Sequence, residues 1–178
     1  ENKGEGAFYG PKIDFNVKDS LGRSWQLGTV QLDFAMAERL EAVYIDQKGK
    51  KQHPVIIHRA ILGSIERFIA VLLEHTAGAL PVWLSPIQAQ ILPVSDKFLD
   101  YAREVEKKLK EAGLRVEIND RNETLGKKIR SGKKEKIPYL LVVGPKEEKA
   151  QTVSVESREK GDLGQMELDK FLGRVRPG

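Results

Sequence analysis

A nine-residue segment near the middle of the chain, GALPVWLSP at 78–86, separates two parts of the sequence with different residue patterns. Glycine and proline interrupt helices and strands, because proline has no backbone N–H and has a fixed φ angle. Before this segment the pattern is typical of antiparallel strands, whereas after it strand-like and helix-like stretches alternate. We therefore predict two domains, residues 1–80 and 87–178, joined by a linker at 81–86.

The first part alternates apolar and polar residues, and one glycine shifts this alternation. In KIDFNV the residues Ile13, Phe15 and Val17 alternate with polar residues, which predicts a strand with one apolar face. Gly28 changes the parity in the return strand, and an isolated glycine there indicates a β-bulge or a ligand close to the backbone. The alternative is a sheet face that is simply exposed to water, which explains its polar residues equally well. The polar face of this sheet would carry Lys12, Asp14, Gln26, Thr29 and Gln31.

The stretch VIIHRAILGSIERF at 55–68 places charged residues in apolar surroundings. Val55–Leu62 is apolar enough for a central strand covered on both faces, and Ser64 is a suitable N-cap for a helix with a buried apolar stripe. His58, inside this strand, is either a hydrogen-bonded core histidine or a ligand or acid–base group. Arg67 would lie in the first helical turn, where a cation opposes the helix dipole, so its position indicates a bound anion such as phosphate.

The second part predicts a small α/β domain with a partly parallel sheet, because strands and helices alternate. Between Arg121 and Lys136 there are seven cations and two anions, a surplus of five in a chain whose net charge is +4. Such a cluster commonly meets phosphate, although a solvated helical face is the alternative. The predicted strands are 88–94, 115–118, 139–143 and 152–157, and the predicted helices are 95–112, one from about 123 and one from about 166.

Composition excludes several kinds of site. The chain has no cysteine, which excludes disulfides, thiolate metal ligands and cysteine nucleophiles. With 40% hydrophobic and 31% charged residues it is typical of a soluble globular protein. No apolar run approaches the roughly 18–20 residues that cross a bilayer, and the first residues lack the pattern of a signal peptide. We expect no membrane partner and a cytoplasmic location.

Five blocks of the sequence resemble threonyl-tRNA synthetases, in the same order as in that family. The Gly63, Glu66 and Arg67 pattern of the third block resembles motif 3 of class II aminoacyl-tRNA synthetases, and the second half of the chain resembles the anticodon-binding domain that prolyl-, glycyl- and histidyl-tRNA synthetases share. The resemblance implies an α+β part of a class II antiparallel-sheet catalytic domain, followed by a small α/β anticodon-binding domain. The blocks are GEGAFYGPKIDF, WQLGTVQLDF, PVIIHRAILGSIERF, DRNETLGKKIR and IPYLLVVGPKE.

The resemblance also implies a catalytic site in the first domain. His58 would be one of three protein ligands of a catalytic zinc ion that takes the amino and hydroxyl groups of threonine, a suitable role for a neutral imidazole. Arg67 would bind the γ-phosphate of ATP, with Mg²⁺ assisting, and Lys12 would lie near the reacting carboxylate and phosphate. We expect His58 and Arg67 to face one common pocket. The other implied residues for threonine, ATP or the tRNA 3′ end are Tyr9, Gln26, Thr29, Gln31 and Ser64.

In the second domain the resemblance implies that Asn122, Arg130 and Glu147 contact the anticodon loop of tRNA(Thr). Hydrogen bonds to base edges suit this role, and the basic cluster can hold phosphates. Glu156 departs from the family pattern, because relatives usually carry arginine at this position in a VSVRSR-like strand. An acid there would weaken or reshape anticodon recognition.

Several parts of a complete synthetase have no counterpart in the sequence. These are motif 1, which builds the homodimer, the arginine of motif 2, and two further zinc ligands. We therefore expect the C-terminal portion of a threonine–tRNA ligase, with an exposed sheet edge, that does not bind zinc tightly or activate threonine by itself. The alternative is a non-catalytic module that only binds the anticodon stem-loop.

Overall fold

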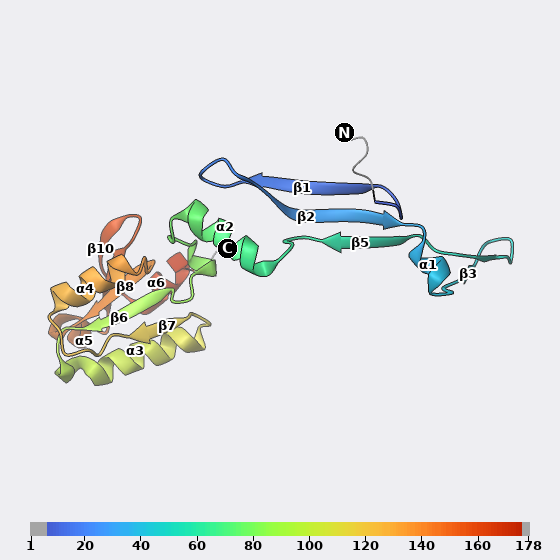
Figure 1. Ribbon diagram of the computed structural model, residues 1–178. Helices are drawn as coiled ribbons and strands as arrows, with labels where there is room; N and C mark the ends of the chain where they lie inside the picture. The colour runs from blue at the N-terminus through green and yellow to red at the C-terminus, as the bar shows by residue number, and fades with distance from the viewer. Residues whose placement is uncertain (1–6, 176–178) are drawn as a thin grey trace. The chain divides into compact units, whose positions relative to one another are not determined.

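A computed structural model describes residues 7–175, and the chain divides into two compact units, residues 1–76 and 77–178 (Figure 1). The boundary falls at Thr76, before the predicted linker at 81–86. That segment contains a short 3₁₀ turn, η1 (Val82–Leu84). No helix within the described part of the chain has the length and apolar character that a bilayer crossing requires.

Unit 1 contains a three-stranded antiparallel sheet in the order β1-β2-β5. β1 and β5 are the outer strands of this sheet within the described residues. The sheet is formed by β1 (Lys12–Lys18), β2 (Ser24–Asp33) and β5 (Ile56–Ala60). The other elements of this unit are α1 (Met36–Arg39), the short hairpin of β3 (Tyr44–Ile45) and β4 (Lys51–Gln52), and α2 (Ile65–Thr76).

The predicted bulge lies beside Gly28. Phe15 pairs with Gly28 and Asn16 pairs with Gln26, so Leu27 is the extra residue on β2. A Cβ atom on Gly28 would lie 3.0 Å from the carbonyl oxygen of Ile61, which leaves little room for a side chain. The bulge restores the polar face, because residues on both sides of it then point to the same surface.

Two predictions for the stretch 55–68 are wrong. β5 is an outer strand rather than a central strand covered on both faces, and Ile57 is 64% exposed. The apolar stripe of α2 is also largely exposed, since Val71 is the residue of this helix that is buried. The apolar side chains of the predicted stripe are covered only in part: Ile65, Ile69 and Leu73 are each more than 40% exposed.

Unit 2 is an α/β domain with a mixed five-stranded sheet in the order β10-β9-β8-β6-β7. β6 lies parallel to β7 and to β8, whereas β9 and β10 are antiparallel neighbours. The strands are β6 (Ala89–Pro93), β7 (Val116–Ile118), β8 (Tyr139–Val143), β9 (Val153–Ser157) and β10 (Gly161–Met166). The helices are η2 (Asp96–Phe98), α3 (Leu99–Glu111), α4 (Leu125–Lys134), α5 (Pro145–Ala150) and α6 (Leu168–Val175).

Apolar side chains cover both faces of this sheet. On one face, Ile91 and Leu141 pack with residues of α3 and α6, which include Leu109 and Phe171. On the other face, Leu92 belongs to a smaller cluster with residues of α4. The five residues of β6 are all buried. Alternate residues of each central strand therefore pack into two apolar clusters on opposite faces of the sheet, as expected for strands between two helical layers.

Candidate functional site

The polar face of the unit 1 sheet is organised around one carboxylate. Asp14 Oδ1 accepts hydrogen bonds from Gln26 Nε2 at 2.7 Å and Thr29 Oγ1 at 2.8 Å. Lys12 Nζ lies 2.9 Å from the other oxygen. The hydrogen bond from Lys12, followed by that from Thr29, lowers the pKa of Asp14, so the carboxylate stays ionised at neutral pH. Lys12 therefore has a fixed anionic partner on this face.

The same network extends along β2 toward the end of the sheet. Gln31 Nε2 donates to Thr29 Oγ1 at 3.2 Å, and the Tyr9 hydroxyl donates to Gln31 Oε1 at 2.7 Å. Five residues that were predicted from the sequence as site residues thus share one network of polar contacts with Asp14. They are Tyr9, Lys12, Gln26, Thr29 and Gln31.

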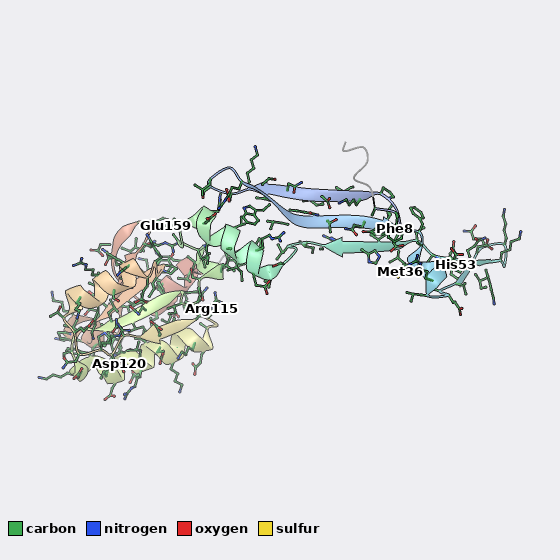
Figure 2. The ribbon with its side chains drawn as sticks, viewed as in Figure 1. Phe8, Met36, His53, Arg115, Asp120 and Glu159 are labelled. Carbon is green, nitrogen blue, oxygen red and sulfur yellow. The ribbon has the colours of Figure 1, made fainter. Side chains whose placement is uncertain are left out.

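A cavity of about 380 Å³ lies at the Tyr9 end of this network, where β2 leads into α1. Figure 2 shows Phe8 and Met36 at this end of the sheet. The guanidinium of Arg39 lies 5.9 Å from the centre of the Phe8 ring. Aromatic, apolar and hydrogen-bonding groups thus meet in one small space, which suits a small polar ligand. The lining residues are Phe8, Tyr9, Gln31, Asp33, Ala35, Met36, Arg39 and His58.

His58 lines this cavity and contacts a buried carboxylate. Its Nε2 atom lies 3.1 Å from Asp33 Oδ2, and its side chain is 45% exposed, so of the two alternatives for His58 the core histidine is wrong. Asp33 Oδ1 accepts hydrogen bonds from the backbone N–H groups of Ala35 at 2.9 Å and Met36 at 2.8 Å. The hydrogen bond from Met36 is the main cause that lowers the pKa of Asp33. An exposed imidazole held by an anion is a suitable metal ligand.

Asp33 is a residue of the site that was not predicted from the sequence. The signal was present, because Asp33 has the same parity on β2 as Thr29 and Gln31 and therefore lies on the same face. Asp33 is the last residue of β2, and an aspartate at the end of a strand is also typical of a turn, so its sequence position did not indicate this role. The structure shows both roles, with one oxygen on the backbone and one on His58.

Arg67 and Ser64 lie beside the other end of the network. Arg67 Nη1 donates to the carbonyl oxygen of Gln26 at 3.3 Å, and its guanidinium lies 5.9 Å from the centre of the Trp25 ring. Ser64 Oγ accepts the backbone N–H of Arg67 at 3.3 Å, so it caps α2 as the sequence predicts. Arg67 does not line the cavity that contains His58. Arg67 contacts the backbone of Gln26, whereas His58 lies at the Tyr9 end of the network. A pocket shared by His58 and Arg67 therefore stays a prediction.

Asn122, Arg130 and Glu147 come from three segments of unit 2. Asn122 is exposed in the loop after β7, Arg130 is exposed on α4, and Glu147 on α5 accepts a hydrogen bond from Ser154 Oγ at 2.7 Å. β7 and β8 both run parallel to β6, so the loop with Asn122 and helix α5 with Glu147 both follow the carboxyl ends of these strands, on the same side of the sheet. Helix α4 also begins on this side. The topology thus brings these three segments to one side of the domain.

The basic cluster divides into buried, paired and exposed cations. Lys128 is 3% exposed and its Nζ donates to the Pro93 carbonyl oxygen at 3.1 Å, so it is not available to phosphate. Lys127 pairs with Glu123 at 2.8 Å. Lys133 forms an ion pair with Glu156, the residue that departs from the family pattern. The exposed cations of the cluster without an ion pair among residues 7–175 are Arg121, Arg130, Lys134 and Lys136.

Comparisons with known proteins agree with both units. Residues 1–76 match the model of the tRNA synthetase class II core domain (G, H, P, S and T), and residues 88–177 match the anticodon binding domain. The structure resembles the crystal structure of the RNA binding domain of threonyl-tRNA synthetase from Cryptosporidium parvum, with a TM-score of 0.88 and 43% identity. This similarity covers 97% of the chain and 44% of that protein chain.

Threonine–tRNA ligases of several bacteria are similar in sequence over nearly the whole chain. The Acetivibrio thermocellus enzyme is 58% identical over 98% of the chain, and the Clostridioides difficile enzyme is 56% identical over 98%. In each case the match covers 27% of the relative, so the chain spans about a quarter of the length of these proteins. With a class II core and an anticodon-binding domain in this order, the chain belongs to the threonyl-tRNA synthetase family and corresponds to its C-terminal portion.

Proposed function

We propose that this chain supplies part of the catalytic sheet and the anticodon-binding domain of a threonine–tRNA ligase. The observation that carries the proposal is the hydrogen-bonded polar face on which Asp14 contacts Lys12, Gln26 and Thr29, and Gln31 links Thr29 to Tyr9. His58 lies at the Tyr9 end of this face, and Arg67 contacts the backbone of Gln26. A face of this kind can align two substrates that react with each other, because its side chains hold one another in place.

In the proposed reaction, the threonine carboxylate attacks the α-phosphate of ATP in line and releases pyrophosphate, and the threonyl group then moves to a ribose hydroxyl of tRNA. Lys12 would neutralise charge on the reacting carboxylate and phosphate, with Asp14 holding its ammonium group in place. Arg67 would bind the γ-phosphate with its planar guanidinium, and Mg²⁺ would neutralise the triphosphate further. Gln26, Thr29, Gln31 and Ser64 would position the ribose, the adenosine of the tRNA end and the phosphates.

The residues around His58 fit a zinc ligand in part. The imidazole is exposed, lines a cavity and contacts a carboxylate, which is the usual environment of a metal-binding histidine. No group of three His, Cys, Asp or Glu residues that could hold a metal ion occurs within the described residues. His58 would therefore be one ligand, and the others would come from the parts of longer relatives that this chain does not span. Zinc bound there would take the amino and hydroxyl groups of threonine.

In unit 2, Asn122, Arg130 and Glu147 would read the anticodon bases, and the exposed cations near them would hold phosphates. The ion pair with Glu156 neutralises Lys133, one cation of the basic cluster, and Glu156 stands where the resemblance implies an arginine. We therefore propose weaker or altered anticodon recognition at the Glu156 position.

A non-catalytic anticodon-binding module is the second candidate. The incomplete set of metal ligands among residues 7–175 favours it for this chain acting alone. Both candidates share the RNA-binding role of unit 2, and they differ in whether unit 1 takes part in threonine activation.

Threonine-dependent ATP–pyrophosphate exchange separates the two candidates. The assay compares this chain with a chimeric ligase in which the chain replaces the matching quarter of the Acetivibrio thermocellus enzyme. We expect exchange by the chimera and none by the chain alone. A chimera that folds and binds tRNA but does not exchange would favour the non-catalytic module, and exchange by the chain alone would contradict the proposal that it needs further parts.

A further inference from the structure

We infer that Asp33 fixes the tautomer of His58, so that Nε2 carries the proton and Nδ1 presents the lone pair to a ligand in the adjacent cavity. For the ligand, this inference rests on the zinc role in the proposed function; for the tautomer, it rests on the contacts of this chain alone. Asp33 is thus a positioning residue, which acts through His58.

The direction of the hydrogen bond follows from its partner. Asp33 Oδ2 lies 3.1 Å from His58 Nε2, and an ionised carboxylate can only accept hydrogen bonds. Nε2 must therefore be the donor, whether the imidazole is neutral or protonated. In the neutral ring the proton is then absent from Nδ1, and this nitrogen becomes the acceptor.

Asp33 cannot easily turn away from His58. Its side chain is 5% exposed, and its Oδ1 atom accepts the backbone N–H groups of Ala35 and Met36 at the start of α1. Rotation of the carboxylate would leave these two donors without their acceptor, which is unfavourable in a buried position. The carboxylate therefore holds Oδ2 in place for the imidazole.

Nδ1 is the ring nitrogen that remains available. Among the residues that the structure describes, His58 has one hydrogen-bond partner, and Nε2 makes that contact. The ring is 45% exposed and lines the cavity of about 380 Å³. A ligand or metal ion that approaches His58 would thus meet the lone pair of Nδ1, while Asp33 holds the opposite nitrogen.

His53 provides a contrast in the same unit. Its Nδ1 atom lies 2.9 Å from the carbonyl oxygen of Ala42, and a carbonyl oxygen can only accept. His53 must therefore carry its proton on Nδ1, which is the tautomer opposite to that of His58. The two residues provide reference signals for each other in one experiment.

The variant Asp33→Asn should exchange the tautomer without removing the helix contact. The amide oxygen can continue to accept the backbone N–H groups of Ala35 and Met36, which directs the amide NH₂ group toward His58 Nε2. Because NH₂ can only donate, Nε2 must accept and the proton must move to Nδ1. The proton then occupies Nδ1, the nitrogen that would otherwise bind a ligand.

The first test is nitrogen-15 NMR of the histidine side chains in this chain, at about pH 8.5, roughly two units above the usual imidazole pKa. We expect the Nε2–H pattern for His58 in the parent chain and the Nδ1–H pattern in Asp33→Asn, with His53 in the Nδ1–H pattern in both. Asp46→Asn is the matched control, because Asp46 also accepts backbone N–H groups but does not contact His58. An Nδ1–H pattern in the parent chain, or no change in Asp33→Asn, would overturn the inference.

If Asp33→Asn fails to fold, which loss of the His53 pattern would show, Asp33→Ser replaces it. The serine hydroxyl can accept a backbone N–H group but cannot reach His58, so the signals of His58 should move to intermediate positions. Unchanged signals would contradict the inference.

The second test measures zinc affinity by competition with a chelator in the chimeric ligase. We expect Asp33→Asn to weaken zinc binding by about 10- to 100-fold, and Asp46→Asn to leave it unchanged. A tautomer change without loss of affinity, in a chimera that binds zinc, would overturn the positioning role. A parent chimera that binds no zinc would instead contradict the proposed function, while the NMR result would still decide the tautomer.

Discussion

β5 in unit 1 and β6 in unit 2 are both rich in apolar residues, yet only β6 is buried. β6 has two neighbouring strands and a helical layer on each face, whereas β5 pairs with β2 alone. The difference shows that apolar composition alone does not determine whether a strand is buried. Burial also requires neighbouring strands and helices that pack against its side chains. The stability of unit 2 therefore comes mainly from its apolar core, whereas the stability of the described part of unit 1 comes more from polar contacts.

Truncation of one apolar residue in each unit should give the largest difference. Leu141 in β8 is fully buried, so Leu141→Ala should lower the free energy of unfolding of unit 2 by about 2–5 kcal/mol. Ile57→Ala, at an exposed position, should change the stability of unit 1 by less than about 0.5 kcal/mol. Denaturant unfolding followed by Trp83 or Trp25 fluorescence, each with the other tryptophan changed to phenylalanine, separates the units. Equal effects would break the comparison.

Two adjacent lysines sharpen the comparison within α4. Lys128→Ala should destabilise unit 2 by about 1–3 kcal/mol, because the buried carbonyl oxygen of Pro93 loses its donor. Lys127→Ala removes an exposed ion pair with Glu123 and should cost at most about 1 kcal/mol. The midpoint of thermal unfolding measures both variants. A larger effect for Lys127 would contradict the structural role of Lys128.

The exposed cations should affect RNA binding rather than stability. Arg130→Ala and Lys134→Ala should each weaken tRNA binding and reduce the slope of log affinity against log salt by about 1. Filter binding across a salt series measures this slope, and the exposed, ion-paired Lys107 on α3 is a control position. If the salt slope stays the same, these side chains do not contact phosphate.

Acid should affect unit 1 through Asp19. Burial would raise the pKa of this carboxyl, but hydrogen bonds from Trp25 and Arg23 outweigh it and lower the pKa to about 2. An aspartate in the unfolded chain has a pKa of about 3.9. Between this pH and the folded-state pKa, the unfolded chain therefore binds more protons than the folded chain. The stabilisation from Asp19 is therefore complete above about pH 4 and is lost as the pH falls through 2. Trp25 fluorescence during acid unfolding should show a weaker pH dependence in Asp19→Asn; the same dependence would exclude this role.

The sequence predicts some features of the molecule better than others. The β-bulge at Gly28 and the strand Tyr139–Val143 follow from local residue patterns, and both are present. The exposure of His58 and the burial of Lys128 could not be predicted in this way, because each depends on elements distant in the sequence. Asp33 was missed for a related reason: its contact with His58 joins residues 25 positions apart.

The central claim is that the polar face of unit 1 takes part in threonine activation, and Arg67 tests it most directly. ATP–pyrophosphate exchange by the chimeric ligase should fall by about 100-fold or more in Arg67→Ala, because a charged contact to the transferring phosphates is lost. Arg59→Ala, on β5, is the matched control and should retain exchange. Exchange by Arg67→Ala at the rate of the parent chimera would contradict the account.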